Sequence, residues 1–205
     1  RERIAPALSE RVALGVSPHA PYTASAELYR ACVALGLPVS THLAESEAET
    51  AWLVDGSGPW ASLRELLEPP AGTTGIRALA ERGALGPSMS AAHCVTVDDE
   101  EISLLSRYDV AVVHCPRSNA YLGCGIAPVG KLRRAGLRVG LGTDSPASAG
   151  SFDMFEELRA AVTLSRAREA DSSALSFREA LDLATIGSAA ALRLDGEIGS
   201  LEPGK

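Results

Sequence analysis

The sequence predicts an α/β fold in which repeated βα units build a parallel sheet. Short apolar or β-branched runs alternate with longer stretches of helical pattern, as such units require. The runs are continuous rather than alternating, which is typical of strands buried on both faces. Five runs are predicted as strands, and they cover residues 12–16, 38–43, 88–94, 110–115 and 137–143.

Local signals mark where several helices begin and end. The first predicted helix covers residues 25–35 and stops at Gly36, and a second begins near Glu45. Four acidic residues at 98–101 open a third helix, and residues 176–179 have the Ser-x-x-Glu form of a capping box. Between the second and third strands, Gly- and Pro-rich loops make a connection long enough to cover a site.

The composition favours a soluble, cytoplasmic protein. Of its 205 residues, 46% are hydrophobic and 22% are charged. No apolar run approaches the roughly 18 to 20 residues that a spanning helix needs. The net charge of −7 argues against nucleic acid or an anionic membrane as a partner.

The cysteines form no CxxC pair and are predicted to be reduced and mostly buried; they are Cys32, Cys94, Cys115 and Cys124.

Polar side chains fall at or just past the carboxyl ends of the predicted strands. They are His19, His42, His93, His114 and Asp144. In a barrel of βα units, catalytic and ligand groups converge at that end of the strands, whatever the reaction. We therefore expect these five side chains to share one face of the sheet.

Four residues form the candidate chemical centre. His42 and Glu45 form a His-x-x-Glu, in which the imidazole can bind a metal while the carboxylate moves protons. A neutral His93 could hydrogen-bond to water or to a leaving group. Asp144 could bind a divalent cation through one oxygen and accept a proton through the other. The alternative interpretations are structural: His42 would be a core histidine, Glu45 an acid at the start of a helix and Asp144 a turn aspartate.

The other two histidines are less clearly chemical. His19 either contacts substrate or orders its own loop, and both readings stay open. His114 is more readily explained as a residue that orders structure. Its neighbours Ser118 and Asn119 fit hydrogen bonds to the backbone of a turn equally well.

Five motifs in order resemble the amidohydrolase superfamily, in its deaminase and chlorohydrolase branch. They are Ser-Pro-His-Ala-Pro-Tyr-Thr at 17–23, Thr-His-Leu-Ala-Glu at 41–45, Ala-Ala-His-Cys at 91–94, His-Cys-Pro-Arg-Ser-Asn at 114–119 and Gly-Thr-Asp-Ser at 142–145. That branch includes adenosine, S-adenosylhomocysteine, aminodeoxyfutalosine and guanine deaminases and the triazine hydrolases. The resemblance covers most of the chain.

The resemblance implies a (β/α)8 TIM-like barrel with one divalent metal ion, Zn²⁺ or Fe²⁺. The five runs would be strands four to eight, so residues 1–205 are expected to be one metal-dependent hydrolase domain, truncated at both ends. His42 would be a metal ligand, and Asp144 a metal ligand and base. Glu45 would shuttle protons and His93 would face the attacking hydroxide, and both would contact substrate. His19 would contact the substrate's sugar or tail.

The chain departs from this family pattern because it holds no His-x-His pair. Members of the branch carry that pair on strand one, where it supplies two metal ligands. Truncation is the simplest explanation, and it also predicts open sheet edges and low stability of the chain alone. The alternative is a non-catalytic barrel fragment without a complete metal site.

The function expected from the resemblance is hydrolytic deamination of an aminopurine nucleoside with release of ammonia. Adenosine, S-adenosylhomocysteine and aminodeoxyfutalosine are the candidate substrates, with a slight preference for the last from the acidic run after His42. A guanine- or triazine-type amino- or chlorohydrolase is the alternative in the same branch. The expected partner is a small-molecule substrate, and a homodimer is the one assembly considered.

Overall fold

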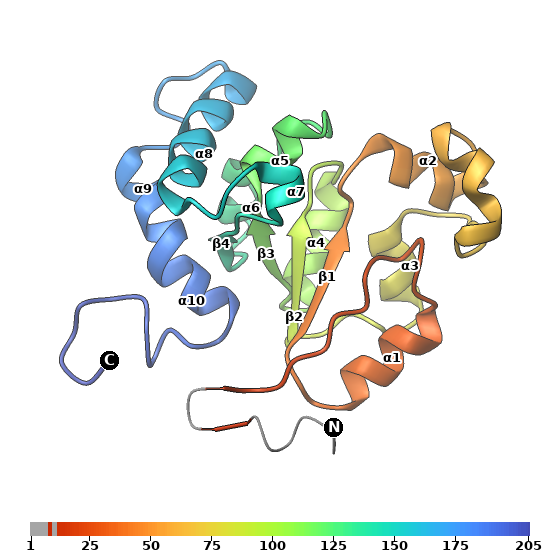
Figure 1. Cartoon of the computed structure of the whole chain (residues 1–205), viewed down its shortest axis with the longest axis horizontal. Helices are drawn as coiled ribbons and strands as arrows, with labels where there is room; N and C mark the ends of the chain where they lie inside the picture. Colours follow the sequence, from red (N-terminus) through yellow and green to blue (C-terminus); the bar gives the residue numbers. More distant parts are fainter. Residues whose placement is uncertain (1–7, 10–11) are drawn as a thin grey trace.

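A four-stranded parallel sheet forms the centre of the molecule, whose computed structural model describes residues 8–9 and 12–205 (Figure 1). The strands lie in the order β1-β2-β3-β4, and each falls within a run that the sequence predicts as a strand. Four of the five predicted strands are therefore confirmed. Their bounds are β1 Val39–Leu43, β2 Met89–His93, β3 Ala111–His114 and β4 Val139–Leu141.

The fifth predicted strand, at residues 12–16, is wrong as a continuous element. Val16 forms an isolated parallel bridge to Val39 of β1. Beyond it the ladder is interrupted because Pro18 has no N–H to donate. The hydroxyl of Ser17 donates to the Ser40 carbonyl at 3.0 Å instead. The segment thus follows the edge of β1 without becoming a regular strand.

Helices surround the sheet, with α1, α2 and α3 to the right of the strands in Figure 1 and α8, α9 and α10 to the left. Two elements are not α-helical: η2 is a 3-10 helix and η3 a π-helical turn. The bounds are α1 Ala26–Ala34, α2 Glu47–Asp55, η2 Pro59–Leu66, α3 Gly75–Glu81, α4 Asp99–Arg107, α5 Pro116–Tyr121, α6 Val129–Arg134, α7 Pro146–Ala149, α8 Met154–Glu169, α9 Phe177–Asp182, η3 Leu183–Gly187 and α10 Ser188–Ala191.

The helix starts that the sequence predicts are nearly all reproduced. The Asp98 side chain caps α4 and Ser176 caps α9, each in a complete capping box. Such a cap contributes about 1 kcal/mol, because it satisfies backbone N–H groups that have no partner inside the helix. The second helix begins two residues later than predicted, at Glu47, because Ser46 rather than Glu45 is its cap.

The core is built from apolar side chains of the strands and of the helices that cover them. Three of the cysteines, Cys32, Cys94 and Cys115, are buried and Cys124 is half-buried, and all four are free thiols, as predicted. Within the described part of the chain, no helix has both the length and the apolar content needed to cross a membrane.

The outer edge of β4 pairs with no further strand among the described residues, in line with the expected open edge, but a side chain covers part of it. The Leu141 N–H donates to the hydroxyl of Ser188 at 3.1 Å, and that hydroxyl lies 2.9 Å from the Leu183 carbonyl oxygen. This close approach needs a glycine on the strand. A Cβ at Gly140 would lie 2.8 Å from the Ser188 Cα, well inside van der Waals contact.

The substitution Gly140→Ala is expected to destabilise the protein by about 1–3 kcal/mol, because the added methyl group pushes α10 away from β4. Urea denaturation would measure the change in the free energy of unfolding. The control is Gly196→Ala, where a Cβ meets nothing within 4 Å. Equal stability of the two variants would contradict the close packing of α10 on β4.

Candidate active site

Three histidine rings lie in contact along the carboxyl edge of the sheet. The ladder between β1 and β2 places Leu43 opposite His93 and His42 opposite Ala92. The ring centroids of His42 and His93 are 5.3 Å apart in a stacked arrangement. The His19 ring, on the segment beside β1, lies 4.8 Å from that of His42. The structure therefore brings His19, His42 and His93 together, as the sequence predicts.

Each of these rings is held through its Nδ1 atom. His42 Nδ1 lies 2.8 Å from the His19 carbonyl oxygen, and His93 Nδ1 lies 2.8 Å from Asn119 Oδ1. His19 Nδ1 lies 2.7 Å from the Thr23 hydroxyl. A carbonyl oxygen only accepts, so His42 carries a hydrogen on Nδ1 and, when neutral, a lone pair on Nε2. An imidazole held in this way is prepared to bind a metal ion through Nε2.

Glu45 faces His93 across the site. Its Oε1 atom lies 3.7 Å from His93 Nε2, and the two side chains are 16% and 1% exposed. His93 Nε2 is buried and has no hydrogen-bond partner among the described residues. The carboxylate and the imidazole nitrogen thus face one another just beyond hydrogen-bond distance, so both can contact one reacting group placed beside them.

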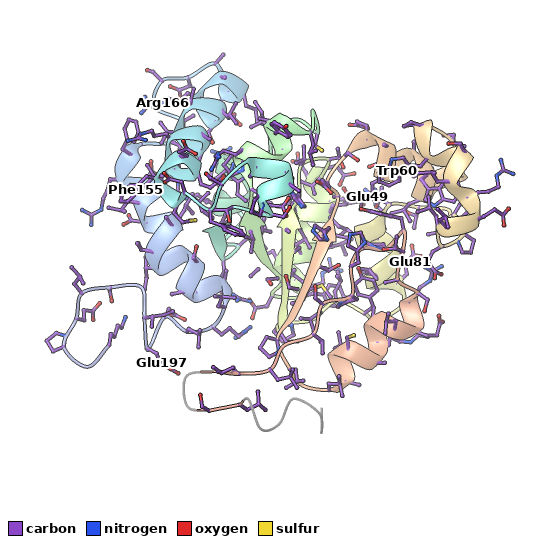
Figure 2. The ribbon with its side chains drawn as sticks, viewed as in Figure 1. Glu49, Trp60, Glu81, Phe155, Arg166 and Glu197 are labelled. Atoms are coloured by element: carbon purple, nitrogen blue, oxygen red, sulfur yellow. The ribbon has the colours of Figure 1, made fainter. Side chains whose placement is uncertain are left out.

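A second, deeply buried carboxylate holds the chain at Glu45. Glu49 accepts hydrogen bonds from the backbone N–H of Ala44 at 2.9 Å and of Glu45 at 2.8 Å. Figure 2 labels Glu49 between the end of β1 and helix α2. Burial raises the pKa of Glu49 to about 7, although these two hydrogen bonds act in the opposite direction. The sequence analysis missed Glu49, whose regular place in a helix hides its burial.

Asp144 follows β4 and is held by two hydroxyl groups. Ser118 and Ser148 each donate to its Oδ2 atom, at 2.6 and 2.7 Å. Partial burial opposes ionisation, but these hydrogen bonds outweigh it and hold the pKa of Asp144 below its ordinary value. Asp144 is therefore an ionised carboxylate at neutral pH, available as a ligand or as a base.

Helix α5 carries the two polar residues whose partners differ from expectation. Ser118 and Asn119 are both fully buried, and neither side chain bonds the backbone of a turn. Ser118 donates to Asp144 instead, and Asn119 bonds to His93. Both partners are far away in sequence, so no local pattern could have identified them. The one available signal was two polar residues beside an apolar strand.

The backbone turns sharply where the strands meet the site. Ala44, His93, Cys94 and Asp144 all have positive φ, between 47° and 75°. Residues other than glycine rarely adopt this left-handed region, because it costs of order 1 kcal/mol or more. The strain falls at the ends of β1 and β2 and shortly after β4, where the candidate groups lie.

His114 lies in a buried position, and its role as a residue that orders structure stays a prediction. It is fully buried, and neither ring nitrogen has a hydrogen-bond partner among the described residues. Burial, followed by the nearby His93, lowers its pKa to about 3. The ring is thus neutral and packs beneath the site.

An aromatic row leads outward from the histidines. The Tyr22 ring lies 5.7 Å from that of His19 and 4.6 Å from that of Trp60, on η2. Figure 2 labels Trp60 farther out than Glu49 on the same side of the sheet. A cavity of about 390 Å³ lies between Glu45, Trp60 and Cys124. The long connection after β1 therefore does border the site, as its length predicts.

The donors present fit one side of a divalent cation site. His42 offers Nε2 and Asp144 a carboxylate, both of which are zinc ligands in proteins. Among residues 8–9 and 12–205, however, no three His, Cys, Asp or Glu side chains are grouped closely enough to hold a metal ion. The described residues supply part of the ligand set and not a complete one.

A family model described as "Amidohydrolase family" matches residues 1–205. A 5-methylthioadenosine/S-adenosylhomocysteine deaminase from Syntrophobacter fumaroxidans is 38% identical over 200 residues, which are 95% of this chain and 42% of the relative. A 5'-deoxyadenosine deaminase from Methanothermobacter thermautotrophicus is 36% identical, over 96% of this chain and 43% of its own length. The chain thus spans less than half the length of these relatives.

A solved structure shows the same fold. The adenosine deaminase from Xanthomonas campestris, which was solved with bound zinc, superposes with a TM-score of 0.85 at 31% identity. The match covers 100% of this chain and 44% of that one. The parallel sheet and its helices therefore correspond to part of an amidohydrolase barrel, as the sequence predicts.

The substitution Glu49→Gln is expected to change how stability depends on pH. The pKa of Glu49 rises from 4.5 in the unfolded chain to about 7 in the folded one, so the folded state binds the proton more tightly. Its contribution is present below pH 4.5 and is lost as the pH rises through 7, a change of about 3 kcal/mol.

Urea denaturation at several pH values would test this by comparing the free energies of unfolding of the protein and the variant. The difference between them should shrink or reverse as the pH rises. Glu81→Gln, at an exposed position labelled in Figure 2, is the control and should follow the parent protein. A Glu49→Gln variant that also follows the parent at every pH would contradict the raised pKa.

Proposed function

Because this chain belongs to the amidohydrolase family, we propose that it forms the reacting face of a hydrolytic deaminase for aminopurine nucleosides. The observation that carries the proposal is the partly buried Glu45 carboxylate at 3.7 Å from His93 Nε2, a nitrogen that has no hydrogen-bond partner among the described residues. A purely structural role rarely needs a carboxylate and an imidazole that face one another without a hydrogen bond between them. Proton transfer to a bound substrate does need such a pair.

A divalent cation would be held by His42 Nε2 and the Asp144 carboxylate, together with further donors. When bound there, it supplies the Lewis acidity that makes water a nucleophile near neutral pH. The partial ligand set and the free Nε2 atom support this assignment, and zinc is the ion named for the similar adenosine deaminase.

The chain's own residues account for the proton movements. Asp144, held ionised by Ser118 and Ser148, takes a proton from the attacking water as its oxygen bonds to the amino-bearing ring carbon. Glu45, protonated at the start, gives its proton to the adjacent ring nitrogen, takes the remaining hydroxyl proton as the carbonyl forms and passes that proton to the leaving amine. The proton held by Asp144 then returns to Glu45. The C–N bond breaks, ammonia leaves and the ring keeps a carbonyl group. His93 Nε2 orients the water by hydrogen bonding.

The substrate class follows from the relatives and the outer part of the site. Both curated relatives are named for adenosines modified at the 5' position. His19, Tyr22 and Trp60 line the way out of the site and offer rings on which a nucleoside can pack. We infer that this chain serves a 5'-modified adenosine.

The direct test is ammonia release from a panel of substrates by the zinc-loaded full-length protein, whose further donors would complete the ligand set that His42 and Asp144 begin. We expect turnover of 5-methylthioadenosine, S-adenosylhomocysteine or 5'-deoxyadenosine, with adenosine and aminodeoxyfutalosine as further members of the panel. Turnover of guanine or of a chlorinated triazine alone would replace the proposal with its alternative. Absence of turnover of every compound, with the metal bound, would reject deamination.

The substitution Glu45→Gln is expected to lower kcat by a factor of about 10² to 10⁴, because the amide cannot deliver a proton. Metal content, measured by atomic absorption, should stay at the parent level, since Glu45 is not a proposed ligand. The control is Glu81→Gln, an exposed carboxylate at the end of α3 that does not line the cavity beside Glu45. Similar kcat values for the two variants would remove Glu45 from the mechanism.

A further inference from the structure

We propose that Asn119 is a positioning residue, which fixes the hydrogen of His93 on Nδ1 and so presents Nε2 to the attacking water. The proposal rests on the proposed function for the identity of the reacting groups. Its structural part concerns only which nitrogen of His93 carries the hydrogen, and that can be measured without turnover.

The contact between the two side chains is short and excluded from solvent. Asn119 Oδ1 lies 2.8 Å from His93 Nδ1, and both residues are 0% exposed. An amide oxygen only accepts a hydrogen bond, so Nδ1 must donate. In the neutral ring the lone pair is then on Nε2, which can accept a hydrogen bond from water. The opposite amide orientation would place the hydrogen on Nε2 and make it a donor.

Burying the Asn119 side-chain amide costs free energy, and its hydrogen bond to His93 accounts for its presence. Asn119 Nδ2 is buried and has no hydrogen-bond partner among the described residues. A buried amide donor without an acceptor destabilises a protein, and an apolar side chain of similar size would avoid that cost. Packing therefore gives no reason for an asparagine at this place, whereas control of the His93 ring does.

Helix α5 is anchored so that Asn119 cannot easily move. The Arg117 N–H donates to the buried Glu157 carboxylate at 3.2 Å, and the Arg117 guanidinium pairs with Glu156 at 2.8 Å. Ser118, between Arg117 and Asn119, donates to Asp144 at 2.6 Å. One turn of α5 therefore aligns the proposed base and the proposed water-orienting histidine together.

The test is ¹⁵N NMR of the zinc-loaded protein labelled at histidine, because the two ring nitrogens of a neutral histidine differ in chemical shift according to which one carries the hydrogen. We expect His93 in the form with hydrogen on Nδ1. Its signals would be assigned by their loss in a His93→Phe variant. His114, which is buried nearby and has no hydrogen-bond partner among the described residues, serves as the internal reference for a ring that no acceptor fixes.

Two substitutions separate positioning from simple packing. Asn119→Leu keeps the size but removes the acceptor, so the Nδ1–H form should no longer be the sole form. We expect kcat to fall by about 10- to 100-fold, with KM and zinc content little changed. Asn119→Asp retains an acceptor at the same place, so His93 should keep its hydrogen on Nδ1. Ser165→Ala, which alters a buried hydroxyl in α8, should leave both measurements unchanged.

The proposal is overturned if His93 of the unaltered protein carries its hydrogen on Nε2. It is also overturned if Asn119→Leu keeps both the parent His93 signals and the parent kcat. If Asn119→Leu does not fold, Asn119→Asp decides, since loss of the Nδ1–H form despite a retained acceptor contradicts the argument. A protein that shows the expected His93 form but releases no ammonia would refute the proposed function and leave the positioning role intact.

Discussion

Backbone hydrogen bonds between β1 and β2 set the register that opposes Leu43 to His93 and His42 to Ala92. Successive side chains of a strand point to opposite faces, so this register by itself would place His42 and His93 on opposite faces of the sheet. The left-handed conformation of His93, with φ of 75°, accompanies the 5.3 Å stacking of the two rings. The approach of Glu45 to His93 Nε2 at 3.7 Å depends on where this turn leaves the His93 ring.

The chain then has to turn away from the strands without losing that alignment. It does so through left-handed residues, since Ala44, His93 and Asp144 have φ of 52°, 75° and 57°. A glycine would adopt these angles more easily, but it could not supply an imidazole or a carboxylate. The strain is kept because hydrogen bonds from distant elements hold these residues, as Asn119 does for His93 and Ser118 for Asp144.

Local patterns in the sequence predict much of the fold and the identity of the main polar groups. Capping at Asp98 and Ser176 involves residues three apart, so it can be read directly from the chain. The predicted strand at 12–16 was wrong because, among the described residues, the run pairs with β1 at Val16 alone, and such pairing between distant segments cannot be read from the run itself. Contacts between elements could not be predicted: Asn119 and its partner His93 are 26 residues apart. Whether the roles assigned to the site residues are correct stays a prediction.

Two buried carboxylates explain how the helices beside the site are held. Burying a carboxylate is unfavourable, and for both Glu49 and Glu157 desolvation raises the pKa to about 7. Glu49 bonds the backbone just before α2, and Glu157 bonds the Arg117 N–H in the first turn of α5. The N–H groups of Ala44 and Glu45 lie before α2, and that of Arg117 lies in the first turn of α5, where helix N–H groups lack a partner within the helix. The α5 cap residue gives no side-chain hydrogen bond. The same two segments carry Glu45 and Asn119. The hydrogen bonds to these carboxylates therefore offset the cost of burial at the two places where the position of a site residue must be fixed. Hydrogen bonds to mobile solvent would hold these backbone segments less firmly.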